Sequence, residues 1–312
     1  MQALFQVILP VFLVLGAGYL TVWRGYLDGT AIDALMTFAQ GIAVPCLLFL
    51  GVAQMDLGQA ITAPLFLSFF TGALVAFILG GLAAYFIFGR PGPDCVAIGF
   101  ACLFSNTLLL GVPITERAYG ADALTANYAL IAMHSPVMYA FGITAMEVVK
   151  SRGHGLSPLA VLSRILSGLI RNPLVIGITA GFAVNLSGLP LTEPVTAAVR
   201  MIGSAGLPAA LFGLGGVLVR YRPDGDLRIV AMIVALSLIL HPAMTLWLGT
   251  RGFSLSVPEL RSATLTAAMA PGINAYLFAN MYGVGKRVAA TSILYGTALS
   301  ILTVWFWLQL LP

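Results

Sequence analysis

The chain has 312 residues, of which 60% are hydrophobic and only 8% are charged, and its formal net charge at pH 7 is +4. Because a soluble domain carries about 25% charged residues, this composition excludes a soluble globular protein. It predicts an all-α integral membrane protein surrounded by a lipid bilayer. The basic balance is typical of charged membrane loops and does not indicate a nucleic-acid partner. The three cysteines, Cys46, Cys95 and Cys102, lie in apolar runs, and their odd number argues against a disulfide framework.

Ten apolar segments are long enough to cross a bilayer, since a spanning helix needs about 20 mostly apolar residues. In chain order they cover residues 3–22, 31–53, 64–88, 96–119, 123–148, 168–186, 194–219, 228–249, 259–282 and 287–311. The first segment lacks the basic start of a signal peptide and is longer than its usual apolar core. We therefore interpret it as the first spanning helix.

The basic residues predict the orientation of these segments, because cytoplasmic loops of membrane proteins are enriched in lysine and arginine. If the N-terminus lies outside the cytoplasm, most of the 15 lysine and arginine residues fall in cytoplasmic loops. They include Arg24, Arg90, Lys150, Arg220 and Lys286. The sequence thus predicts a multi-pass protein with both termini outside and the middle loop inside the cytoplasm.

An internal repeat emerges when the chain is shifted by 163 residues. The matches are Pro10 with Pro173, Gly18 with Gly181, Gly25 with Gly188, Pro45 with Pro208, Leu48 with Leu211, Phe49 with Phe212, Tyr119 with Tyr282 and Gly120 with Gly283. Some coincidences are expected where glycine and proline are common, but three clusters share one register. We predict two five-helix repeats, residues 1–155 and 156–312. Five is odd, so the second repeat is inverted, an architecture that gives alternating access to a midplane site.

The fourth and ninth segments are interrupted by proline, glycine and polar residues. The fourth contains Asn106, Thr107, Gly111 and Pro113, and the ninth contains Pro271, Gly272 and Asn274. Proline lacks the N–H group that a helix needs, so we expect Pro113 and Pro271 to break the two helices. Freed backbone groups survive in a bilayer only where they line a cavity or pack within protein. We therefore predict that these two broken helices cross at the centre of the molecule.

Two matched breaks indicate the central binding site of a transporter. We predict that this site is formed by Asn106, Thr107, Gly111, Pro113, Pro271, Gly272 and Asn274. Helix N-termini favour negative charge, and Asn106 and Asn274 add amide groups. Since lysine and arginine do not occur at mid-helix depth, the site is suited to an anion held by amides and helix dipoles. The simpler alternative is that proline and glycine kink the helices for packing while the asparagines bond neighbouring helices.

The coupling ion is left open by the sequence, between H+ and Na+. The aspartates and glutamates fall in loops or near helix ends, so coupling through a buried carboxylate has no support. His134 and His241 lie within the fifth and eighth segments, and histidine titrates near neutral pH. They form either a proton relay or ordinary polar groups of the bundle. No metal site and no other cofactor is predicted.

Motifs of enzymes and ATPases are missing. Gly283-Val-Gly-Lys286 is followed by Arg287 and lacks the spacing of a phosphate-binding loop, which excludes ATP-driven transport by this chain. The sequence contains no H-E-x-x-H motif, no paired carboxylates on one helix and no cysteine–histidine cluster. We therefore expect a protein that is not an enzyme.

The chain resembles the auxin efflux carrier family of membrane transporters, in a bacterial branch that includes proteins named as malonate or malate permeases. The motifs that carry the resemblance are Asn106–Pro113, Tyr119-Gly120, Pro-x-x-x-Phe at 45–49 and 208–212, Arg171-Asn-Pro173, Ala270–Asn274 and Tyr282-Gly283. The resemblance implies a scaffold of helices 1, 2, 6 and 7, and a mobile transport unit of helices 3–5 and 8–10. It also implies crossing broken helices 4 and 9 with Asn106 on the substrate, elevator-type motion, and frequent homodimers.

This sequence departs from the plant members of the family in three places. Ser105 stands where they have a proline beside the asparagine, Asn274-Ala275 occupies the place of their second helix-9 proline, and their long cytoplasmic loop is absent. Substrate shape and regulation are therefore not carried over. We expect a secondary transporter of the bacterial inner membrane that moves a small organic anion, a malonate-like mono- or dicarboxylate. The alternatives are a carrier of a neutral or amino-acid-like solute, a passive channel and a membrane-embedded enzyme.

Overall fold

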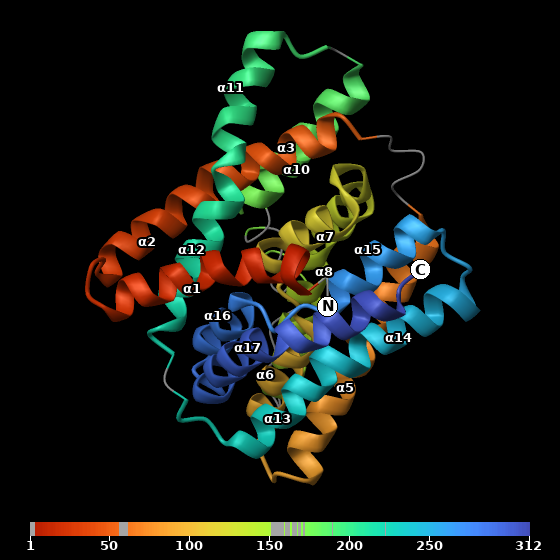
Figure 1. Cartoon of the computed structure of the whole chain (residues 1–312). Coiled ribbons are helices and arrows are strands. Elements are labelled where there is room, and N and C mark those ends of the chain that lie inside the picture. The colour runs from red at the N-terminus through yellow and green to blue at the C-terminus, as the bar shows by residue number, and fades with distance from the viewer. Residues whose placement is uncertain are drawn as a thin grey trace. The chain divides into compact units, whose positions relative to one another are not determined.

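A computed structural model describes residues 4–55, 62–150, 159, 163, 167, 170, 172–188, 190–221 and 223–312 of the chain (Figure 1). The first half contains η1 (Leu4–Ile8), α1 (Leu9–Trp23), α2 (Gly29–Phe38), η2 (Ala39–Ala43), α3 (Val44–Ala53), α5 (Ala63–Phe86), α6 (Gly92–Leu103), η3 (Thr107–Gly111), α7 (Val112–Tyr119), η4 (Ala121–Ala123) and α8 (Leu124–Lys150). The second half contains α10 (Pro173–Ser187), α11 (Glu193–Ser204), α12 (Gly206–Leu218), α13 (Leu227–Ala235), η5 (Leu236–Leu240), α14 (His241–Trp247), η6 (Leu248–Gly252), α15 (Val257–Ala267), α16 (Ile273–Tyr282) and α17 (Lys286–Leu310).

Helical runs long and apolar enough to cross a membrane account for seven of the ten predicted segments. They are Leu4–Trp23, Gly29–Ala53, Ala63–Phe86, Leu124–Lys150, Glu193–Leu218, Leu227–Gly252 and Lys286–Leu310. Two further predicted segments are divided, 96–119 into α6, η3 and α7, and 259–282 into α15 and α16. Within 168–186 the structure describes α10, while residues 168–169 and 171 lie outside the described residues. The prediction of a helical integral membrane protein is confirmed.

Several prolines sit inside these runs without ending them. Pro10, Pro45, Pro113 and Pro242 each stand second in an α-helix that directly follows a π-helical turn. A proline ring clashes with the carbonyl four residues earlier, and the wider π turn relieves that clash. The expectation that Pro113 breaks its helix was therefore wrong. The chain leaves the helical path earlier, between Leu103 at the end of α6 and Thr107 at the start of η3.

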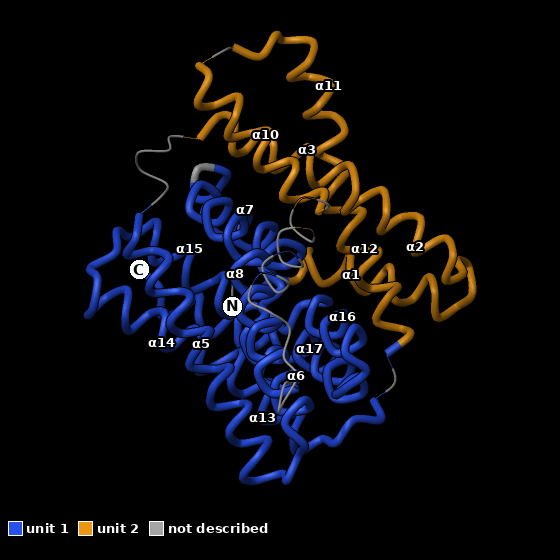
Figure 2. The backbone as a smooth tube through the Cα atoms, turned by 180° about the vertical axis from the view of Figure 1, so that it is seen from behind, with its two compact units in different colours: residues 1–8, 62–165, 221–312 blue, residues 9–61, 166–220 orange. Residues whose placement is uncertain are grey.

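The chain forms two compact units, and each draws helices from both halves of the sequence (Figure 2). Unit 1 comprises residues 1–8, 62–165 and 221–312, and unit 2 comprises residues 9–61 and 166–220. Unit 2 thus holds the first, second, sixth and seventh predicted segments, apart from the start of the first. The predicted repeat boundary between residues 155 and 156 lies outside the described residues.

Glycines let the helices of unit 2 approach each other to backbone contact, as small residues do at membrane helix interfaces. A Cβ atom on Gly18 of α1 would lie 1.9 Å from the carbonyl oxygen of Phe212 in α12. A Cβ atom on Gly181 of α10 would lie 2.7 Å from the carbonyl oxygen of Phe49 in α3. A shift of 163 residues moves Gly18 onto Gly181 and Phe49 onto Phe212. The two contacts are therefore equivalent under the shift of the predicted repeat.

Further glycines of the predicted repeat lie at helix ends in both halves. Gly188, Gly120 and Gly283 cap α10, α7 and α16 with φ angles of 65°, 86° and 75°. Gly25, the counterpart of Gly188, has a φ of 77° just after α1. Positive φ angles strain residues that carry a Cβ atom, which explains glycine at these positions.

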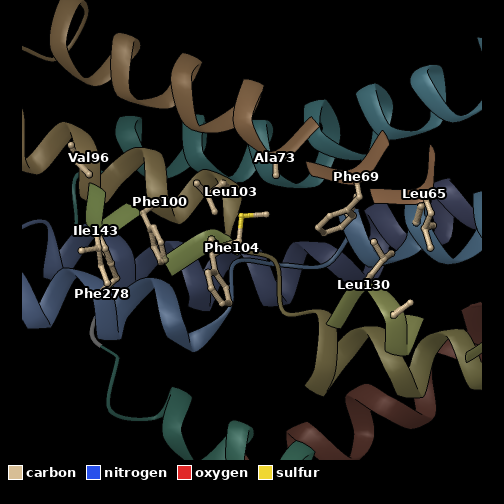
Figure 3. Close-up of a cluster of buried hydrophobic side chains, with 14 of the residues drawn as sticks. Leu65, Phe69, Ala73, Val96, Phe100, Leu103, Phe104, Leu130, Ile143 and Phe278 are labelled. Carbon is tan, nitrogen blue, oxygen red and sulfur yellow. The ribbon is translucent and has the colours of Figure 1, made fainter. Parts of the chain in front are cut away.

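The core of unit 1 is rich in aromatic side chains (Figure 3). Phe69 of α5, Phe100 of α6 and Phe278 of α16 are fully buried, and Phe104 is almost so. The rings of Phe100 and Phe278 stack with centroids 3.9 Å apart, and Phe104 lies 5.4 Å from Phe100. This cluster surrounds the point at which α6 ends.

Candidate functional site

The two interrupted segments meet in unit 1. Ser105 and Pro271 form an antiparallel β-bridge. The Asn106 N–H donates to the carbonyl oxygen of Ala270, and the Gly272 N–H donates to that of Phe104, both at 2.8 Å. These bonds satisfy backbone groups that the broken helices leave free, as burial in a membrane protein requires. We call residues 104–107 and 268–272 the crossover.

Two glycines lie at the crossover or directly beside it. A Cβ atom on Gly272 would lie 3.4 Å from the carbonyl oxygen of Ser105 and 3.5 Å from the Cα atom of Asn106. On the other side, a Cβ atom on Gly296 of α17 would lie 2.7 Å from Cδ of Pro271. α17 therefore approaches Pro271 this closely only because Gly296 has no side chain, whereas a Cβ atom on Gly272 would make ordinary van der Waals contacts.

Four helix ends converge at the crossover, the C-termini of α6 and α15 and the N-termini of η3 and α16. On the carbonyl side, Phe104 and Ala270 accept the bridge bonds, and the Ser105 hydroxyl lies 3.4 Å from the carbonyl oxygen of Ala267. On the N–H side, η3 begins at Thr107 and α16 begins at Ile273. Carbonyls of both segments thus accept hydrogen bonds within the crossover, and the two helix N-termini beside it favour a negative ligand.

Asn106 begins the turn that follows the first break. Its side-chain Oδ1 accepts a hydrogen bond from the Leu109 N–H at 3.3 Å, which caps η3. Its Nδ2 has no hydrogen-bond partner although the residue is only 6% exposed. An unpaired amide in such surroundings is costly to bury, so this group is a candidate ligand donor.

Asn274 lies in the first turn of α16, two residues beyond Gly272. Its Oδ1 accepts a hydrogen bond of 3.2 Å from the hydroxyl of Tyr139 in α8. Both residues are partly exposed, unlike Asn106. Tyr139 was not among the predicted site residues, because an aromatic residue in an apolar helix carries no local signal.

The other predicted binding residues lie at differing distances along the chain from the break. Thr107 is 4% exposed, and its N–H donates to the Ser105 carbonyl at 2.9 Å, so it belongs to the crossover. A Cβ atom on Gly111 would lie 3.5 Å from Cγ of Met269. Pro113 is buried inside the helical run that follows, past the break. The structure brings Asn106, Thr107, Pro271 and Gly272 together, with Asn274 beginning the adjacent helix.

His241 ties the crossover to a neighbouring helix. Its Nε2 lies 3.2 Å from the carbonyl oxygen of Phe69, and its Nδ1 lies 3.4 Å from the Ser105 hydroxyl. Because a carbonyl can only accept, Nε2 carries a proton, and the one Ser105 hydroxyl proton is shared between Nδ1 and the Ala267 carbonyl oxygen, both at 3.4 Å. Both nitrogens of this fully buried ring thus have structural partners.

His134 lies among aromatic rings in the same unit. Its ring packs edge-on against Phe104 at 4.5 Å and against Phe69 at 5.7 Å, and its Nε2 has no partner. The Phe69 ring also contacts His241, at 4.9 Å. An apolar ring thus packs against both imidazoles, and the proton relay stays a prediction.

A family model described as "Membrane transport protein" matches residues 3–308. The chain belongs to this family. It is 25% identical over 305 residues to a protein of Rhizobium meliloti (strain 1021) named "Putative malonate transporter", a match covering 97% of this chain and 94% of that protein. It is 23% identical over 259 residues to "Auxin efflux carrier component 5" of Arabidopsis thaliana, covering 70% and 72% of the two chains.

Membership in the membrane transport protein family confirms the predicted resemblance to the auxin efflux carriers. It makes the protein a multi-pass membrane transporter rather than an enzyme, with a transported substrate and a lipid environment. The crossover is then the feature of this transporter that combines broken helices, buried polar groups and helix N-termini.

A second polar cluster in unit 1 of the transporter was missed by the sequence analysis. Asn127 of α8 donates from Nδ2 to the hydroxyls of Thr266 at 2.8 Å and Thr115 at 3.4 Å, while its Oδ1 has no partner. All three residues are fully buried. The signal was present, a polar residue in a spanning segment, but its shorter hydrogen bond is to Thr266 of α15, 139 residues away.

Proposed function

We propose that this protein is a secondary transporter that binds a small organic anion, a mono- or dicarboxylate such as malonate, at the crossover. The observation that carries the proposal is the unpaired, buried Nδ2 group of Asn106 beside two helix N-termini. Amide donors and positive helix ends stabilise a carboxylate. The name of the Rhizobium meliloti relative supports malonate as the first substrate to test.

The division into two units suggests how such a transporter gives alternating access. Unit 1 contains the crossover, and unit 2 contains helices held together by glycine contacts. We propose that unit 1 carries the substrate in an elevator-type motion and that unit 2 is the scaffold. Ten spanning helices in two inverted repeats fit this scheme, and the paired contacts of Gly18 and Gly181 in unit 2 support that symmetry.

The distribution of basic residues supports a place in the bacterial inner membrane with both termini outside the cytoplasm. Coupling to H+ or Na+ and assembly into a homodimer belong to the same proposal. Labelling by an impermeant thiol reagent tests the orientation at single cysteines introduced by Tyr26→Cys and Asp224→Cys, in exposed loops that the prediction places inside the cytoplasm. Labelling from the outside of intact cells would show that the orientation is the reverse of the proposed one.

The function is tested by radiolabelled malonate counterflow in proteoliposomes, without pH or sodium gradients. We expect accumulation that unlabelled mono- and dicarboxylates abolish. We expect Asn106→Ala and Asn274→Ala each to lower it at least tenfold, as the loss of a hydrogen bond to a charged group predicts.

The matched control is Asn280→Ala, which alters an exposed asparagine on the same helix as Asn274. It should transport as the unaltered protein does. Full transport by Asn106→Ala and Asn274→Ala, with both variants folded, would contradict the proposed site. Counterflow inhibited by neutral or amino-acid-like solutes but not by carboxylates would favour the alternative substrate class.

A further inference from the structure

We infer that Tyr139 is a positioning residue that orients the Asn274 amide, so that the site presents hydrogen-bond donors and selects carboxylates over neutral carboxamides. This inference rests on the proposed function and adds a residue and a basis of selectivity to it. It follows from the way in which the two asparagines of the site use their amide oxygens.

Both asparagines have their oxygen occupied by a donor of the protein itself. Oδ1 of Asn106 accepts from the Leu109 N–H, and Oδ1 of Asn274 accepts from the Tyr139 hydroxyl. A hydrogen bond to the oxygen fixes the orientation of each amide, and the NH₂ group, which carries two donors, is left for a ligand. Two different local devices, a helix cap and a tyrosine, thus produce the same outcome.

The Tyr139 hydroxyl is held in place by the packing of its ring. The ring centroid lies 5.5 Å from Phe100, 5.7 Å from Phe104 and 6.4 Å from Phe278. Phe104 belongs to the crossover, where its carbonyl accepts from Gly272. The aromatic cluster therefore fixes the hydroxyl relative to the backbone that carries Asn274, which limits the rotation of the amide.

A donor-rich site discriminates between ligands that differ only in their polar groups. A carboxylate offers acceptors alone, whereas a carboxamide also brings an NH₂ group that would face the amide donors. Unpaired polar groups in a partly buried site are the strongest basis of rejection. Malonate and its neutral diamide, malonamide, have similar size, so they report this discrimination directly.

The test is Tyr139→Phe, which removes the hydroxyl and keeps the ring. In malonate counterflow we expect KM to rise roughly tenfold with little change in the maximal rate, since one hydrogen bond that orients the amide is lost. We also expect malonamide to become a better competitor relative to malonate. A purely structural role would lower the maximal rate or the amount of folded protein without changing this competition.

Two comparisons separate positioning from other effects. Tyr128→Phe makes the same change in the same helix at a buried tyrosine, and it should leave KM and competition unchanged. In an Asn274→Ala background, Tyr139→Phe should have no further effect on KM, because non-additivity marks residues that act through each other. Additive effects of the two substitutions would overturn the inference.

A second variant keeps the test decisive if Tyr139→Phe is poorly folded. Asn274→Asp keeps an acceptor for the Tyr139 hydroxyl but replaces the NH₂ group by an oxygen. It should impair malonate counterflow at least as much as Asn274→Ala does. Retained malonate selectivity in Asn274→Asp would show that Asn274 presents its oxygen to the ligand, and the inference would fail.

The outcome also distinguishes this inference from the proposed function. Absence of carboxylate counterflow in the unaltered protein contradicts the proposed function itself. Carboxylate counterflow in the unaltered protein, together with unchanged KM and competition in Tyr139→Phe, contradicts the positioning role alone.

Discussion

The two units of the protein differ in how many polar side chains they bury. In the described part of the chain, the buried polar side chains lie in unit 1, including Asn106, Asn127, His134 and His241. The buried side-chain atoms without partners lie there too, namely Asn106 Nδ2, Asn127 Oδ1, His134 Nε2, Thr264 Oγ1, Thr297 Oγ1, Thr303 Oγ1 and Trp305 Nε1. Unit 2 is held mainly by glycine and apolar contacts, together with hydrogen bonds from the partly buried Asn185 Nδ2 to the carbonyls of Val52, Ala53 and Met55. Polar groups inside a membrane protein are costly and mark function. The difference therefore indicates that transport depends on residues of unit 1, whereas unit 2 is stabilised by the packing of its helices.

The largest expected effect concerns the packing of unit 2. Gly18→Ala should lower the free energy of unfolding by about 3 kcal/mol, since its methyl group would lie 1.9 Å from the Phe212 carbonyl oxygen. Gly16→Ala is the control, because a Cβ atom there meets nothing within 4 Å. Thermal unfolding in detergent measures both. Equal melting temperatures for the two variants would show that α1 and α12 are not in backbone contact.

The next effect should appear in transport and not in stability. Asn106→Ala removes the unpaired Nδ2 group and one helix cap, so unfolding should become easier by only about 1 kcal/mol. Malonate counterflow should fall roughly thirtyfold, or by about 2 kcal/mol, which is within the range that a hydrogen bond to a charged ligand contributes. Melting temperature and counterflow measured on one preparation check this. If Asn106→Ala lost stability and counterflow to the same extent, the expected contrast between a unit 1 that serves transport and a unit 2 that serves stability would not hold.

How far the sequence alone could go is clear from the two breaks. Proline, glycine and asparagine identified the two segments that are interrupted. They were not enough to place the first one, because the π turn before Pro113 lets the helix continue. Periodicity does not predict such turns, which depend on how neighbouring helices pack.

The partners of the site were beyond sequence reasoning for a different reason. Tyr139 and Asn274 are 135 residues apart, and His241 and Ser105 are 136 apart. Each is unremarkable within its own segment, and only folding makes them neighbours. The candidate asparagines were predictable from residue type, whereas the orientation of their amides was not.

A smaller effect on stability is expected for a substitution at His241. This residue allows structural and functional polar groups to be compared within unit 1. His241→Phe keeps an aromatic ring but leaves the Phe69 carbonyl and the Ser105 hydroxyl without that partner. Unfolding should become easier by about 1.5 kcal/mol, the contribution of one to two net hydrogen bonds. The pH dependence of counterflow should keep its midpoint, because both nitrogens serve the structure. A variant of full stability whose transport no longer depends on pH would establish the proton relay instead.

The smallest effect concerns the charged groups of unit 2, which lie at its exposed surface. Arg220 Nη1 and Asp33 Oδ1 form an ion pair of 2.8 Å, with side chains 40% and 63% exposed. Exposed pairs contribute about 0–1 kcal/mol because water and salt screen them. Asp33→Asn should therefore change the free energy of unfolding by no more than about 0.5 kcal/mol, and less still at high salt. Chemical denaturation at two salt concentrations measures this. A loss as large as that of Gly18→Ala would mean that unit 2 depends on charge as well as on close glycine packing, and the contrast between the two units would no longer hold.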